Sequence, residues 1–189
     1  MSFARGRPPW RRSVRRRTSP HDDVKVDRYA KSEEIVGAVE ERLQLVEEMR
    51  PLADRAQLVL SLEINGPVSV RADPVRTRQI VRNLLDNAIK NTPAGGSVSL
   101  RAAPLRNMAE ITVADTGVGI PADQLDAVFE EFVQLKRSPE GGGSGLGLAI
   151  CRRLADAMGG RITVSSEEGK GSAFVVSLPG GDSRFKIED

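Results

Sequence analysis

The chain reads Asn83-Leu84-Leu85-Asp86-Asn87-Ala88-Ile89-Lys90-Asn91-Thr92 near its centre. On a helix, Asn83, Asn87 and Lys90 occupy positions i, i+4 and i+7, so these polar side chains share one face. The opposite face is apolar and consists of Leu84, Leu85 and Ala88. Amide oxygens are hard ligands that suit Mg²⁺, and an ammonium group suits phosphate. The pattern predicts an amphipathic helix whose polar face either binds a metal and phosphate groups or is simply hydrated.

The segment before this helix predicts a helix followed by strands. From Ser32 onward, apolar residues recur at spacings of three and four as far as Met49. Pro51 is expected to interrupt that helix, with a further short helix over 51–57. Alternating apolar residues predict a strand over 58–64, and a short strand is expected over 68–71.

Residues after Asp73 predict an alternation of strands and helices. Asp73-Pro74 is typical of a helix start, because aspartate caps free amide groups and proline fits the first turn. Strands are expected over 97–102, 109–114, 161–166 and 172–178, and helices near 122–129 and over 145–158. The last strands are expected to pair as hairpins. This order predicts an α+β fold, a two-layer α/β sandwich with helices on one face of a mixed, largely antiparallel sheet.

Length and composition indicate one globular domain with polar ends. The chain has 189 residues, of which 39% are hydrophobic. We expect a disordered Arg-rich arm over 1–30, a domain over 31–180 and a tail over 181–189. Cys151 is the one cysteine, and its apolar surroundings predict a packed thiol in a reducing compartment. Neither a membrane-spanning run nor a secretory signal is recognisable, so a cytoplasmic location is expected.

The basic residues are concentrated in the arm. The net charge of the whole chain is only +2, while the first 17 residues contain no acidic residue and seven arginines: Arg5, Arg7, Arg11, Arg12, Arg15, Arg16 and Arg17. The rest of the chain is therefore mildly acidic, and nucleic acid is not an expected partner of the domain. A hydrated arm is the simpler interpretation, and a peripheral contact with an anionic membrane surface is the alternative.

Three further stretches carry possible binding chemistry. In Asp115-Thr116-Gly117-Val118-Gly119, a carboxylate at a strand end can accept from an amine such as that of adenine, and the glycines permit close approach; a plain turn is the alternative. Glycines at 141–147 precede a helix, where free N–H groups suit an anion, although a flexible linker is the alternative. They match neither a Walker nor a Rossmann pattern. Gly169-Lys170-Gly171-Ser172 is typical of a hairpin turn.

The order and spacing of these stretches resemble the ATPase domain of histidine kinases, which has the Bergerat fold shared with gyrase. The resemblance covers about residues 33–178. Residues 83–92 resemble the N box, 115–119 the G1 box, 129–132 the F box, 143–147 the G2 box and 169–171 the last glycine box.

The resemblance implies ATP and Mg²⁺ as cofactors. Asn87 would coordinate Mg²⁺, and Asn83 and Lys90 would support the metal and phosphates during catalysis. Asp115 would accept from the adenine amino group. The remaining implied nucleotide contacts are Gly117, Gly119 and Ser172 around the base, the backbone of Gly143, Ser144, Gly145, Leu146 and Gly147 at the phosphates, and either Lys136 or Arg137 at the γ-phosphate.

Two residues depart from what relatives of this kind carry. Asn91 stands where the family often has an aromatic residue, and loss of that stacking would weaken binding by about 1 kcal/mol. Asn83 stands where gyrase-like relatives have a glutamate that activates water. Because an amide cannot act as a general base, Asn83 favours phosphoryl transfer to a protein side chain over ATP hydrolysis.

The expected phosphate acceptor is not recognisable in this chain. His21 is the only histidine, and its surroundings match little of the family's H box. The resemblance therefore implies a histidine on a separate dimerisation domain or partner kinase chain, with a response regulator downstream. An anti-sigma-factor-like serine kinase and a non-catalytic nucleotide-binding regulator are the alternative functions.

Overall fold

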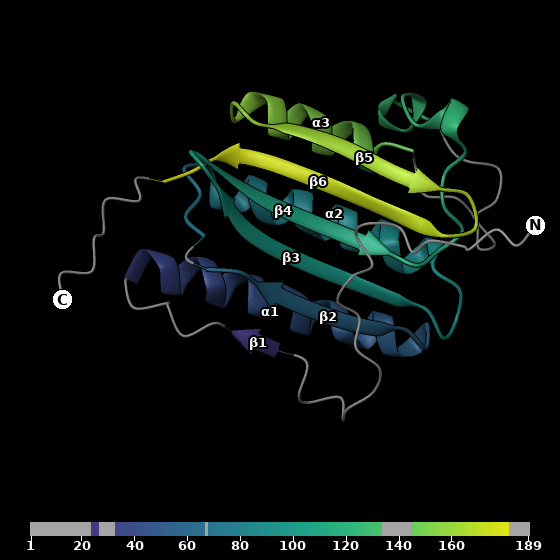
Figure 1. The fold of residues 1–189 in the computed structure, drawn as a ribbon, viewed down its shortest axis with the longest axis horizontal. Coiled ribbons are helices and arrows are strands. Elements are labelled where there is room, and N and C mark those ends of the chain that lie inside the picture. The colour runs from purple at the N-terminus through teal and green to yellow at the C-terminus, as the bar shows by residue number, and fades with distance from the viewer. Residues whose placement is uncertain (1–23, 27–32, 67, 134–144, 182–189) are drawn as a thin grey trace, which may run out of the picture.

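A computed structural model of the chain describes residues 24–26, 33–66, 68–133 and 145–181; for 24–26 and 33–43 it describes the backbone alone. In these parts, strands and helices form a sandwich of two layers (Figure 1). The strands are β1 (Val24–Val26), β2 (Val59–Ile64), β3 (Ser97–Leu105), β4 (Met108–Asp115), β5 (Arg161–Glu167) and β6 (Gly171–Pro179). The helices are α1 (Glu33–Arg55), α2 (Pro74–Asn91) and α3 (Gly147–Ala157), with the short 3-10 turns η2 (Ala122–Gln124) and η3 (Ala127–Phe129).

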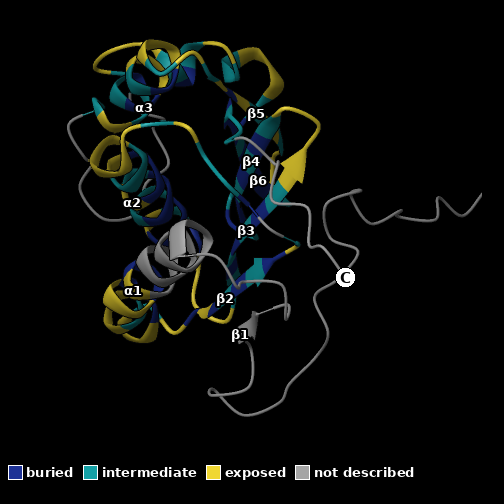
Figure 2. Ribbon diagram, turned by 90° about the vertical axis from the view of Figure 1, so that its left-hand side faces the viewer, coloured by how far each residue is buried: buried dark blue, intermediate teal, exposed yellow. Residues whose placement is uncertain are grey.

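The sheet is mixed, and its strand order is β1-β2-β3-β4-β6-β5. The pairs β1–β2 and β2–β3 are parallel, while β3–β4, β4–β6 and β5–β6 are antiparallel. A parallel pair needs a crossover connection, which α2 provides between β2 and β3. Figure 2 shows α1, α2 and α3 on one side of the sheet. The predicted two-layer α+β sandwich is therefore confirmed.

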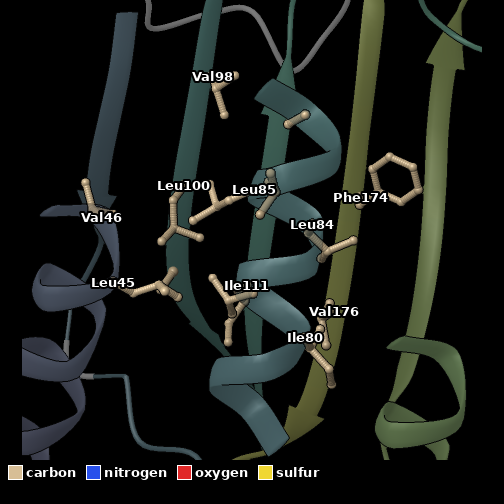
Figure 3. Packing of buried hydrophobic residues seen from close by; sticks show 14 of the residues in the cluster. Leu45, Val46, Ile80, Leu84, Leu85, Val98, Leu100, Ile111, Phe174 and Val176 are labelled. Carbon is tan, nitrogen blue, oxygen red and sulfur yellow. The ribbon is translucent and has the colours of Figure 1, made fainter. Parts of the chain in front are cut away.

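The core lies between the sheet and α2, the central helix. One face of α2 is buried, namely Ile80, Val81, Leu84, Leu85, Ala88 and Ile89. It packs against inward-facing residues of the sheet that include Leu100, Ile111, Phe174 and Val176 (Figure 3). Asp73 caps the helix by accepting a hydrogen bond from the Arg76 amide at 3.1 Å, as its sequence predicted. Burial of this stripe fixes α2 and leaves its asparagines on a different face.

Four local expectations differ from the structure. Helix α1 continues through Pro51, because Met49 and Ala53 on either side are both buried and this packing offsets the hydrogen bond that proline removes. In place of a strand over 68–71 there is one bridge, between Val70 and Gly180. The helix expected near 122–129 is two separate turns, in which only Val128 is buried and rewards packing.

The fourth difference is strand β1, which falls inside the segment expected to be disordered. It pairs with β2 from Val24 to Val26. Three residues are too few for an alternating pattern to indicate a strand. The rest of the expected arm and the tail over 182–189 lie outside the described residues.

Removal of one buried α2 side chain should destabilise the whole domain. Leu84 is fully buried, so Leu84→Ala is expected to lower the free energy of unfolding by about 3 kcal/mol through lost burial and a cavity. Urea unfolding followed by circular dichroism measures this. Leu105→Ala at the half-exposed end of β3 is the matched control and should cost about 0.5 kcal/mol. Equal losses in both variants would contradict the placement of α2 in the core.

Candidate functional site

Asn87 is held in place by its neighbour one helical turn away. The Asn91 side-chain amide donates to the Asn87 backbone oxygen at 2.8 Å and to its side-chain oxygen Oδ1 at 3.1 Å. A carbonyl oxygen has two lone pairs, so Oδ1 can still bind a further group. Asn91 thus orients the amide oxygen that the sequence predicts as a metal ligand. Residues at positions i and i+4 of a helix are neighbours, so the sequence spacing indicates this pair. The interpretation of Asn91 as the replacement of an aromatic residue did not include this contact.

Lys90 and Asn83 face different surroundings on the same helix. The Lys90 ammonium lies 2.6 Å from the carboxylate of Asp86 and is exposed to solvent. The thiol of Cys151 on α3 lies beside the Asn83 side chain and donates a hydrogen bond to the backbone oxygen of Ile80 on α2 at 3.7 Å. Burial raises the pKa of that thiol to about 11, and the neighbouring Asn83 side chain acts in the opposite direction. Cys151 is therefore a packed thiol, as predicted, and it joins α3 to α2.

Asp115 is a buried carboxylate at the end of β4. Its oxygen Oδ1 accepts hydrogen bonds from the backbone amides of Gly117 at 2.8 Å and Ser172 at 3.2 Å. Desolvation by burial raises the pKa of Asp115 to about 6, against the opposing effect of these two bonds. No hydrogen bond to the second oxygen, Oδ2, is recorded from any residue that the structure describes. Asp115 is thus a fixed acceptor with one oxygen available to a ligand.

The loop after Asp115, residues 115–120, lies directly on the end of α2. We call it the G1 loop. The Val118 amide donates to the Asn91 backbone oxygen at 3.1 Å. A Cβ atom at Gly117 would lie 2.2 Å from that same oxygen, so only glycine fits there. Asn91 therefore touches the G1 loop with its backbone and Asn87 with its side chain, and so links the two predicted parts of the site.

The backbone just before α3 is hydrogen-bonded to the backbone that follows η3. The Phe132 amide donates to the Gly145 oxygen at 3.0 Å, and Gly145 has a φ of +69°, which favours glycine. At the helix start, Leu146 provides no side-chain cap, and nothing lies within 4 Å of a Cβ built at the exposed Gly147. The first-turn amides of a helix lack partners within the helix and suit an anion. The predicted contacts Lys136, Arg137, Gly143 and Ser144 lie outside the described residues, as does His21.

The structure thus connects most of the predicted residues that it describes. Hydrogen bonds join Ser172 to Asp115, the G1 loop to Asn91, and Asn91 to Asn87, while Asn83 lies beside Cys151 of α3. Lys90 pairs with Asp86, a partner that the i, i+4 spacing also indicates. Ser166, which no sequence pattern indicates as a site residue, hydrogen-bonds Ser172 and the amide of Ile120.

Two kinds of feature are absent from the residues that the structure describes. Among these residues, no three His, Cys, Asp or Glu side chains gather into a metal site. A Mg²⁺ ion fits here only as an ion held by few protein ligands together with phosphate and water oxygens, which is its usual mode beside nucleotides. Across the same ranges, no helix combines the length and apolar character needed to cross a membrane.

The sequence of this region matches a known protein family. The model of the histidine kinase-, DNA gyrase B- and HSP90-like ATPase family matches residues 72–182. The chain belongs to this family of ATPase domains. The predicted resemblance is therefore confirmed.

The similar proteins include sensor histidine kinases. The adaptive-response sensory kinase SasA of Synechococcus elongatus is 41% identical over 138 residues, which cover 72% of this chain and 36% of that protein. The circadian input-output histidine kinase CikA of the same species is 45% identical over 126 residues, covering 65% of this chain and 17% of that one. The chain thus spans well under half of these relatives.

Solved structures give the same result. Full-length ShkA in complex with AMPPNP superposes with a TM-score of 0.68 at 37% identity, covering 75% of this chain and 30% of that chain. The catalytic domain of the histidine kinase ThkA gives 0.66 at 26% identity, covering 75% of this chain and 92% of that chain. Within the family, the chain therefore has the fold of the catalytic domain of sensor histidine kinases.

The raised pKa of Asp115 predicts an effect of pH on stability. Since the native state binds this proton more tightly than the unfolded state, the contribution of Asp115 to stability is greatest below its unfolded pKa of 3.8 and is lost as pH rises through about 6. Asp115→Asn cannot ionise, so it should be more stable than wild type by on the order of 3 kcal/mol near pH 8.

Thermal unfolding of both proteins across pH measures the difference. The two should converge only below about pH 3.8, where Asp115 is protonated in both the native and the unfolded state. A difference that stays constant with pH would contradict a desolvated carboxyl at this position.

Proposed function

We propose that the chain is the ATP-binding catalytic domain of a two-component sensor histidine kinase. It would transfer the γ-phosphate of ATP to a histidine on a separate dimerisation domain or partner chain. The observation that carries the proposal is the buried Asp115 carboxylate, which is fixed through Oδ1 and linked through the G1 loop and Asn91 to Asn87. Family membership supports the same reading.

Asp115 would select the base. A carboxylate accepts hydrogen bonds and cannot donate them when ionised, so Oδ2 suits the 6-amino group of adenine and opposes the 6-oxo group of guanine. The glycines of the G1 loop would let the flat ring approach the backbone. The close contact between Gly117 and Asn91 and the proximity of Ser172 to Asp115 support a pocket of this kind.

Asn87 would hold Mg²⁺ beside the phosphates. Its Oδ1 is a hard oxygen donor oriented by Asn91, and it keeps a lone pair for the ion. When bound, Mg²⁺ would neutralise charge on the phosphate oxygens. Lys90 would turn from Asp86 to support the phosphates, which is feasible because the pair is exposed.

The start of α3 would receive the phosphate end of the nucleotide. Gly145, Leu146 and Gly147 lie at the start of this helix, where the side chain of Leu146 makes no capping hydrogen bond. Gly143, Ser144 and either Lys136 or Arg137 are proposed to complete this contact from the adjoining segment. Arginine and lysine both attract phosphate, the first through a planar fork and the second as a point charge.

Transfer to a histidine is favoured over hydrolysis by Asn83. In the transfer step, an imidazole nitrogen of the acceptor would attack the γ-phosphorus, the bond to the β–γ bridging oxygen would break, and ADP would leave. Such a nucleophile requires no base to activate water, and the Asn83 amide could not act as one. Asn83 would instead support the phosphates and metal from its position beside Cys151. A response regulator would then receive the phosphoryl group from the histidine.

Two variants separate base binding from metal binding. Asp115→Asn should weaken ATP binding roughly 10- to 100-fold, because a charged hydrogen-bond acceptor is lost. Asn87→Ala should abolish most of the gain in ATP affinity that Mg²⁺ gives to the wild type. Isothermal titration calorimetry with and without Mg²⁺ measures both effects.

The control for these variants is Asn107→Ala, at an exposed turn beside the start of β4 and so at the opposite end of that strand from Asp115. It should bind ATP as the wild type does. Normal affinity in both Asp115→Asn and Asn87→Ala would refute the site assignment.

The phosphotransfer itself is tested with an acceptor. Incubation with γ-labelled ATP and a histidine-bearing dimerisation domain should label that domain, and the label should be lost in acid, as phosphohistidine is. Asn87→Ala and an acceptor lacking the histidine should give no label. Acid-stable label would indicate an anti-sigma-factor-like serine kinase, and ATP binding without transfer to any acceptor would indicate a non-catalytic regulator. A cytoplasmic location and a peripheral membrane contact by the Arg-rich arm belong to the same proposal.

A further inference from the structure

The turn between β5 and β6, residues 167–171, is docked along the G1 loop. The Gly169 amide donates to the Val118 oxygen at 2.7 Å. A Cβ atom at Gly119 would lie 2.1 Å from the Glu167 oxygen, and one at Gly171 would lie 2.1 Å from the Asp115 oxygen. Figure 1 shows why they meet, since β4 ends and β6 begins at the same end of the sheet. The two segments therefore form one packed unit around Asp115.

Ser166 is the side chain at the centre of this unit. Its hydroxyl oxygen accepts from the Ile120 amide at 2.8 Å, at the far end of the G1 loop. The same hydroxyl lies 2.9 Å from the Gly171 oxygen and 3.0 Å from the Ser172 hydroxyl. Ser166 and Ser172 are directly opposite each other on β5 and β6. One small side chain thus joins both strands of the hairpin to the G1 loop.

The hydrogen-bonding capacity of a serine fits this position. A hydroxyl donates once and accepts twice. Ser166 can donate to the Gly171 oxygen while it accepts from Ile120 and from the hydroxyl of Ser172, so that every contact is satisfied. An alanine here would leave the Ile120 amide and the Gly171 carbonyl without their partner. Unpaired polar groups at a half-buried position destabilise the folded protein.

The consequence reaches Asp115 through Ser172. The Ser172 amide is one of the two donors that fix Asp115 Oδ1, and Ser166 holds Ser172 and its preceding peptide. We infer that Ser166 is a positioning residue of the nucleotide site, which holds the G1 loop and the Ser172 amide so that Asp115 is aligned with the 6-amino group of the base. This inference rests on the proposed function. It assigns adenine selectivity partly to a residue of β5 that precedes the last glycine box, residues 169–171, and belongs to none of the glycine boxes.

The readout is selectivity for the 6-amino group. The wild-type chain, Ser166→Ala and Ser166→Cys are titrated with ATP and with purine riboside triphosphate, which lacks that group and is otherwise the same. Ser166→Ala should lower the affinity for ATP roughly tenfold and leave that for the analogue nearly unchanged, so that the ratio of the two affinities falls. Ser166→Cys keeps the shape with a weaker donor and acceptor, and should give a smaller fall in the same direction.

Ser165→Ala is the matched control, because Ser165 is exposed on the opposite face of the same strand. It should leave both affinities unchanged. A parallel loss for both nucleotides in Ser166→Ala would show a merely structural role and overturn the inference, as would an unchanged ratio. If Ser166→Ala does not fold, an unchanged ratio in Ser166→Cys overturns it. A wild type that does not prefer ATP to the analogue would refute the proposed base contact itself, which separates the two failures.

Discussion

The fold buries a carboxylate, that of Asp115, to 3% exposure at the end of β4 and provides two backbone amides to hold one of its oxygens. Burial makes the charged form costly, so such a group persists only where its surroundings fix it. One donor, Gly117, is two residues from Asp115, and the other, Ser172, lies on β6, 57 residues further along the chain. Asp115 is therefore held as an acceptor only when β4 pairs with β6 and the tight turn after β5 is in place. Much of the local architecture, including three glycines without room for a side chain, follows from that requirement.

The second half of the site depends on a helix with two different faces. The apolar stripe of α2 is buried under the sheet and fixes the rotation of the helix, which in turn determines where its asparagines point. Asn91 then joins this helix to the G1 loop through its backbone oxygen and to Asn87 through its side chain. Base selection and metal binding are proposed to occur in separate places, and Asn91 connects them. The side-chain amide of Asn91 thus orients Asn87 from a position where an aromatic residue would instead provide stacking.

Much of this arrangement could be predicted from the sequence because its signals are local or periodic. The cap at Asp73, the apolar stripe of α2 and the alternation in β2 and the hairpin strands each need only short-range patterns. What could not be predicted depends on tertiary contacts. Pro51 is tolerated because buried neighbours hold α1 together, and the bridge between Val70 and Gly180 joins segments that are far apart in the chain. The role of Ser166 could not be predicted, because a serine in a strand is common. Its position becomes informative only when its partners on two other segments are known.

The central claim is that Asp115 and Asn87 belong to one nucleotide site. A crystal structure of the chain with AMPPNP and Mg²⁺ tests it most directly. The account predicts the 6-amino group of the base within hydrogen-bond distance of Asp115 Oδ2, and the metal ion bound to Asn87 Oδ1 and to phosphate oxygens. A nucleotide bound elsewhere, or one whose base avoids Asp115 while its metal lies away from Asn87, would contradict it.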